Sequence, residues 1–156
     1  MRRARLVVVL LNAALLVGAC GGGGSQPRRS TPHAERGAAA VIRAWADTLR
    51  RGDIRGAAEF FALPSIVSNG TPPVVLHTRA DARLFNASLP CGARLIKTTS
   101  SGRFTTATFR LTERPGPGTC GSGTGLLART TFVIRKGKIE QWRRVANVPA
   151  PSGRTV

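Results

Sequence analysis

The first part of this chain has apolar residues at helical spacing, and the rest has the sequence signals of β-strands. This division limits the folds that the chain can adopt. Apolar residues recur every three or four positions over 34–51, which predicts an amphipathic helix. Capping residues open two further expected helices, a short one over 53–61 and a third over 78–89. Two short extended pieces, 65–68 and 74–76, lie between them around a turn rich in proline.

The second part of the chain predicts four strands arranged as two hairpins. Segments 93–100 and 103–113 flank a Ser-Gly turn, and segments 126–135 and 138–145 flank a Lys-Gly turn. The stretch 115–125 between the hairpins is so rich in glycine that we expect a loop. The order of elements therefore predicts an α+β domain.

Each expected turn sets a register, and the register decides which side chains face the helices. Ser100 opposite Arg103, and Arg135 opposite Lys138, would direct one alternating set of residues toward the helices. That set comprises Ile96, Ala107, Phe109 and Leu111 with Arg94, Thr98 and Thr105 in the first hairpin, and Ala128, Phe132, Ile134, Ile139 and Val145 with Thr130, Gln141 and Arg143 in the second. A one-residue slip or bulge would exchange the faces and bring Trp142 inward.

Three stretches of the chain carry a resemblance to a known superfamily. They are V-I-R-A-W-A-D-T-L-R-R-G-D over 41–53, the segment 64–78, and K-G-K-I-E-Q-W-R-R over 136–144. Together they resemble the nuclear transport factor 2-like superfamily, in its SnoaL-like bacterial branch. The resemblance implies a cone over 34–148, in which three N-terminal helices pack on a curved antiparallel sheet of about four main strands around a pocket. Enzymes of this kind, such as ketosteroid isomerase and scytalone dehydratase, place Asp, His or Tyr in that pocket, whereas other members are binding or dimerisation domains.

The first residues predict where the protein works. Arginines and a short apolar run precede Val17-Gly18-Ala19-Cys20, a pattern that resembles the lipobox of bacterial lipoproteins. We therefore expect a signal peptide over 1–19, a lipid on Cys20 and a flexible Gly-rich tether over 20–33. The domain would then stand on the extracytoplasmic face of the cell membrane, with a disordered tail over 149–156.

The cysteines and the charge narrow the expected chemistry and the expected partners. With Cys20 lipidated, Cys91 and Cys120 form an even pair in an oxidising compartment, which predicts a disulfide. Two cysteines without nearby histidine do not complete a zinc site, so we expect no metal. The 24 Lys and Arg outnumber the 7 Asp and Glu. Anionic lipid or a phosphate-bearing wall polymer is the expected counter-charge, and nucleic acid is not. For most of the arginines, however, the composition favours simple solvation of the surface.

The candidate functional residues divide into a pocket set and a catalytic set. The expected pocket comprises Trp45, Phe61, Thr130, Phe132, Gln141, Trp142 and Arg143, although the aromatic members could equally be plain core. His77 and Asp47 are the candidate catalytic groups, and no cofactor is expected. We expect the domain to bind a small apolar or acidic ligand, or a protein partner, without catalysis. The alternatives are a pocket enzyme of the ketosteroid isomerase type (isomerase, cyclase or hydrolase) and a module that forms homodimers within an envelope complex.

Overall fold

The computed structural model describes residues 32–146. In chain order the elements are α1 (Pro32–Arg50), α2 (Ile54–Glu59), β1 (Phe61–Ser68), β2 (Val74–Leu76), α3 (Arg79–Ser88), β3 (Gly92–Ser101), β4 (Phe104–Thr112), a 3₁₀ turn (Gly121–Gly123), β5 (Leu127–Arg135) and β6 (Lys138–Val145). The expected signal peptide, Cys20 and the expected tail over 149–156 lie outside the described residues. The tether was expected to reach residue 33, but α1 already begins at Pro32.

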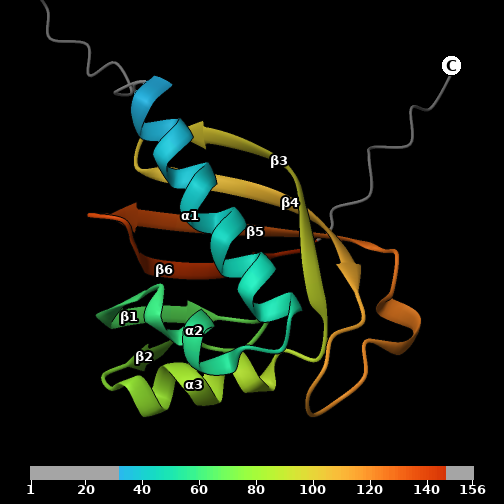
Figure 1. Ribbon diagram of the computed structural model, residues 1–156. Helices are drawn as coiled ribbons and strands as arrows, with labels where there is room; N and C mark the ends of the chain where they lie inside the picture. The colour runs from blue at the N-terminus through green and yellow to red at the C-terminus, as the bar shows by residue number, and fades with distance from the viewer. Residues whose placement is uncertain (1–31, 147–156) are drawn as a thin grey trace, which may run out of the picture.

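The strands form one curved sheet of six strands in the order β2-β1-β6-β5-β4-β3 (Figure 1). Neighbouring strands are antiparallel except β1 and β6, which are parallel. The prediction of about four antiparallel strands is therefore correct for β3 to β6 and wrong for the whole sheet. It failed because the pairing of β1 with β6 joins segments far apart in sequence, which no local pattern encodes. The three helices also do not all precede the sheet, since α3 follows β2.

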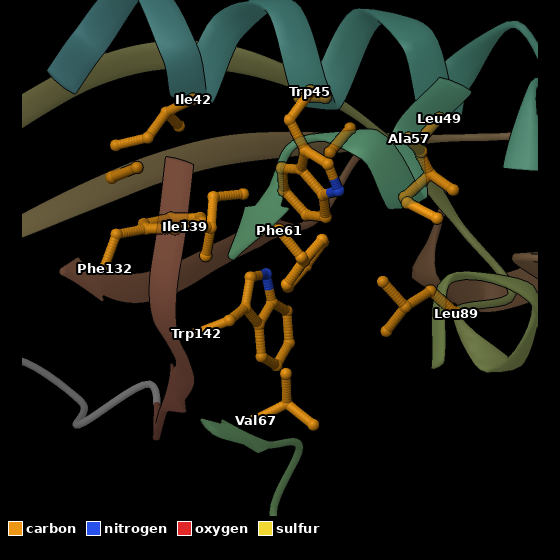
Figure 2. Packing of buried hydrophobic residues seen from close by; sticks show 14 of the residues in the cluster. Ile42, Trp45, Leu49, Ala57, Phe61, Val67, Leu89, Phe132, Ile139 and Trp142 are labelled. Carbon is orange, nitrogen blue, oxygen red and sulfur yellow. The ribbon is translucent and has the colours of Figure 1, made fainter. Parts of the chain in front are cut away.

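Helix α1 crosses the concave face of the sheet and delivers Trp45 to the centre of the core (Figures 1 and 2). The Trp45 ring makes edge contacts with four aromatic rings, at centroid distances of 5.7 to 6.4 Å. These rings belong to Phe61, Phe109, Phe132 and Trp142. The Trp45 Nε1–H donates a 2.9 Å hydrogen bond to Oδ1 of Asn86, a fully buried residue of α3. The N–H of the central indole is therefore hydrogen-bonded although it is buried, and the same bond joins α1 to α3.

Local signals set the helix ends. Gly52 follows α1 with φ of +81°, a conformation that favours glycine. The Asp53 side chain accepts a 2.8 Å hydrogen bond from the Gly56 N–H and caps α2. Helix α2 ends at Glu59 instead of residue 61, because the chain turns there into β1. The expected start of the third helix is confirmed, since Thr78 caps α3 and forms a capping box in which Thr78 and Asp81 are bonded reciprocally.

Both hairpins form, but bulges change which residues face the helices. In the first, Ser100 lies opposite Thr105 and not Arg103, and a register shift between Leu95 and Lys97 leaves Ile96 47% exposed. The expectation that Ile96 faces the helices is therefore wrong, and the buried residue is Leu95. The bulge adds a residue to β3, which exchanges its faces beyond that point.

In the second hairpin, Arg135 lies opposite Lys138 as predicted, but the register shifts between the partners of Val133 and Ile134. Beyond that shift Trp142 is buried and pairs with Phe132.

No helix of the described residues is both long and apolar enough to cross a membrane.

Candidate functional site

A cavity of about 200 Å³ lies where the C-terminal half of α1 faces β3 to β6. The segment that follows α3 and the loop before β5 complete its wall. Its lining is Trp45, Leu49, Asn69, Leu89, Pro90, Cys91, Ala93, Phe109, Leu111, Gly123, Ala128, Thr130, Trp142 and Arg144. Most of these side chains are apolar, so the cavity suits an apolar molecule or part of one.

A disulfide between Cys91 and Cys120 secures one side of this cavity, as the cysteine pair predicted. It connects the start of β3 to the Gly-rich loop between β4 and β5. A Cβ on Gly123 would lie 3.2 Å from the Cys120 sulfur and 3.5 Å from the Cys91 sulfur. The loop therefore lies directly against the disulfide, where a larger residue would have to displace its neighbours.

Two charged side chains directly after β4, those of Glu113 and Arg114, hold the same loop in place through hydrogen bonds. The Glu113 carboxylate accepts hydrogen bonds from the N–H groups of Cys120 and Gly121 and from the Thr124 hydroxyl, at 2.9 to 3.0 Å. The Cys120 N–H, followed by the Thr124 hydroxyl, holds the pKa of Glu113 below its usual range. These partners lie seven to eleven residues from Glu113, so no local pattern in the sequence indicates this role.

Arg114 provides the second anchor and is 7% exposed. Its guanidinium donates to the carbonyls of Ala87 and Leu89 at the end of α3, at 2.6 to 3.2 Å. Burial lowers the pKa of Arg114, which stays charged because an arginine titrates far above neutral pH. The cavity wall is thus held by hydrogen bonds and a covalent link and does not depend on apolar packing alone.

The polar groups of the cavity are few and come from different elements. Thr130 is 4% exposed and lies opposite Arg144 in the β5–β6 pair. Arg144 is exposed, and Asn69 is half-buried in the turn after β1. Nε1 of the buried Trp142 has no hydrogen-bond partner in the part of the chain that the structure describes. The polar side chains among the described lining residues are thus those of Arg144, Asn69 and Thr130, and the lining includes no Asp, Glu or His.

The structure separates the expected pocket residues into three groups. Trp45, Thr130 and Trp142 line the cavity. Phe61 and Phe132 are fully buried in the core and are not part of the lining. Gln141 and Arg143 are paired with Val133 and Thr131 on the face of the sheet that points away from α1. Their placement in the pocket is wrong, because the bulge in the β5–β6 pair exchanges the two faces of β6.

His77 and Asp47 do not reach this cavity. His77 lines a second, open cavity of about 650 Å³ between β2 and α3, where Asp81 is also found. Hydrogen bonds with the backbone and the side chain of Thr78, and then with the backbone of His77, hold the pKa of Asp81 below its usual range. Asp47 forms a 3.4 Å ion pair with Arg50 along α1. Among residues 32–146, no three metal-binding side chains come together.

Sequence reasoning missed several lining residues, notably Arg144 and Asn69. One signal for Arg144 was available: it lies two residues after Trp142 and shares its face in a strand. The alternative in which Trp142 points inward would therefore have brought Arg144 with it. Asn69 gave no such signal, because its position depends on how the turn after β1 sits against the end of β6.

Comparisons with known proteins show which solved structures share this fold. No protein-family model matches the sequence, and no curated protein does. Among solved structures, a candidate polyketide cyclase from Xanthomonas campestris is 20% identical with a TM-score of 0.54, covering 72% of this chain and 92% of that one. A candidate ketosteroid isomerase from Kribbella flavida is 18% identical with a TM-score of 0.53, covering 77% and 86%.

A third structure, a nuclear transport factor 2-like protein of unknown function from Burkholderia xenovorans, is 12% identical with a TM-score of 0.52, covering 76% of this chain and 90% of that one. Identities this low establish a common fold and leave the activity open. The chain has the α+β fold with a curved sheet that ketosteroid isomerase-like and nuclear transport factor 2-like proteins share.

Proposed function

We propose that this domain binds a small apolar molecule carrying an anionic group, without catalysis, on the extracytoplasmic face of the cell membrane. The observation that carries the proposal is the position of Arg144. Arg144 belongs to the lining of a mostly apolar cavity, and it shares a face with Trp142 and Thr130. An apolar body would lose its contact with water inside the cavity, while an anionic head would meet the guanidinium at the exposed edge.

Within residues 32–146, no ion pair neutralises the charge of Arg144. The ion pairs of the described residues join Asp47 to Arg50, Glu59 to Arg79 and Glu140 to Arg135, and Arg144 belongs to none of them. A hydrogen bond to a charged group contributes about 1.5 to 3 kcal/mol. We therefore expect a carboxylate ligand to bind roughly tenfold or more tightly than the matching alcohol, since 1.4 kcal/mol corresponds to a factor of ten.

Calorimetric titration with octanoate and octanol tests this expectation. Wild type should prefer octanoate, and Arg144→Gln should remove most of that preference while octanol binding stays unchanged. Arg143→Gln is the matched control, because its side chain carries the same charge on the opposite face of β6. Equal binding of the acid and the alcohol by wild type, or an equal effect of both substitutions, would contradict the proposal.

The membrane location rests on Val17-Gly18-Ala19-Cys20 and needs its own test. The full chain should partition into detergent, and Cys20→Ala should abolish that partition, because two acyl chains anchor a protein stably and one does not. Recovery of unlipidated wild type from the medium would contradict the anchor and leave the cavity proposal standing.

A pocket enzyme is the second candidate, favoured by neighbours described as a polyketide cyclase and a ketosteroid isomerase. Such an enzyme would need an acid or base beside its substrate. Of the expected catalytic groups, His77 has the chemistry that suits this role best, but it lines the second cavity. Conversion of a polyketide or steroid substrate that is lost in His77→Gln and retained in Arg144→Gln would support this candidate over simple binding.

A further inference from the structure

The face of the sheet that points away from α1 carries a concentration of positive charge. Residues that alternate along β3 to β6 with the buried inner set point to this outer face. Its basic members are all exposed and come from all four strands: Arg94, Lys97, Arg110, Arg129 and Arg143. We call these residues the outer basic face.

The register brings these cations close together without intervening carboxylates. Arg94 lies directly opposite Arg110, a cross-strand pairing of like charges that destabilises a sheet. Lys97 and Arg129 flank Thr108 from either side on the neighbouring strands. None of these cations belongs to an ion pair of the described residues. The protein thus tolerates a repulsive arrangement that an external anion would relieve.

Hydroxyl groups fill the space between the charges. Thr99 lies opposite Thr106, and Thr106 lies opposite Thr131. The Thr106 and Thr131 hydroxyls are 3.0 Å apart, which shows that they project from the same face. Thr131 lies opposite Arg143. Alternating guanidinium and hydroxyl groups offer hydrogen-bond donors across all four strands, over about 14 Å given the usual strand spacing.

We propose that the outer basic face binds a flexible anionic polymer with repeating phosphodiester groups. Phosphate oxygens accept hydrogen bonds from both guanidinium and hydroxyl groups, and a chain of phosphates can meet several cations at once. The sheet curls around α1, so its outer face is curved (Figure 1). A flexible chain follows a curved surface, whereas a planar bilayer meets it over a smaller area. This inference is independent of the cavity and its ligand.

A second copy of the protein is a poorer occupant of this face. Two copies packed face to face would bring two sets of unpaired cations together, which costs several kcal/mol for close like charges. A base-stacking nucleic acid is also a poorer fit. The aromatic ring on this face, Phe104, lies at the hairpin end, where the Arg103 guanidinium covers it 5.0 Å from the ring centroid.

Fluorescence anisotropy with a labelled poly(glycerol phosphate) chain tests the proposal. The full chain carrying Cys20→Ser avoids any contribution from the expected lipid. The triple variant Arg94→Gln/Arg129→Gln/Arg143→Gln removes charge from the outer basic face. The matched control, R36Q/R43Q/R55Q, removes the same charge from exposed positions of α1 and α2.

The face variant should bind the polymer about tenfold or more weakly, with a shallower dependence on salt, because fewer counterions are released. The control, which has the same net charge as the face variant, should bind within about twofold of the unsubstituted chain. Equal weakening by both variants would overturn the proposal, since binding would then follow net charge alone. Binding of phosphatidylglycerol vesicles that depends on the outer basic face, without polymer binding, would also overturn it and assign the face to the membrane. Unchanged circular dichroism and thermal midpoints show that both variants are folded.

Discussion

The buried hydrogen bond between Trp45 and Asn86 offers the sharpest test of how this core is organised. Asn86→Leu keeps a similar volume but removes the oxygen that accepts from the Trp45 Nε1–H at 2.9 Å. Both residues are almost wholly buried, so the N–H would lose its partner away from water. An unpaired buried donor costs about 1 to 3 kcal/mol, and we expect Asn86→Leu to lower the free energy of unfolding by about that amount.

A double-mutant cycle separates this hydrogen bond from packing. In the background of Trp45→Phe there is no N–H to leave unpaired, so Asn86→Leu should cost about 1 to 2 kcal/mol less than it does in wild type. Urea unfolding followed by far-ultraviolet circular dichroism gives each free energy without relying on tryptophan fluorescence. Ser88→Ala is the control, because its exposed hydroxyl also bonds within α3, to the Phe85 carbonyl. It should change stability by about 0.5 kcal/mol or less. A coupling energy near zero would refute the reasoning, because it would mean that the indole does not depend on Asn86.

Three further outcomes are expected. Replacing Cys91 and Cys120 by alanine should lower the free energy of unfolding by about 3 to 4 kcal/mol in urea, because the disulfide spans a sequence separation of 29, and a loss below about 1 kcal/mol would contradict that estimate. Because the pKa of Glu113 is lowered in the folded state, its stabilising effect is fully present above the ordinary carboxyl pKa and is lost as pH falls from there through the lowered folded-state pKa. The stability difference between wild type and Glu113→Gln should therefore shrink below about pH 4 in unfolding curves, and a constant difference would argue against the hydrogen-bonded carboxylate. Gly52→Ala should cost about 1 to 3 kcal/mol by thermal unfolding, since φ is +81° and the new Cβ would lie 3.0 Å from the neighbouring loop, whereas Gly37→Ala in open space on α1 should stabilise the protein.

The second cavity contains the residues whose chemistry suits catalysis, but it is separate from the apolar cavity. His77 and Asp81 lie together at the start of α3, where Asp81 is the carboxylate of the capping box that Thr78 begins. The structure agrees, since the Asp81 carboxylate accepts from the backbone N–H groups of His77 and Thr78 at 2.9 to 3.0 Å. A carboxylate committed to a helix cap is a poor partner for proton transfer, because its hydrogen-bonding capacity is already used.

Local patterns determined the elements of this protein. Helical spacing, the capping residues Asp53 and Thr78 and the glycine at position 52 predict the helices to within a few residues, because these signals act within one turn of the chain. Turn residues likewise predict both hairpins. The disulfide follows from counting cysteines, because Cys91 and Cys120 remain as a pair once Cys20 is assigned to the lipid.

Tertiary structure alone decided which side chains meet in the cavity. Strand residues alternate between faces, so a single bulge in the β5–β6 pair moves Gln141 and Arg143 outward and Trp142 and Arg144 inward. The parallel pairing of β1 with β6 brings Asn69 to the same place from a distant part of the chain. Bulges and distant strand pairings are selected by the packing of the whole core around Trp45. The sequence therefore determined the elements, and packing across the sheet determined the site.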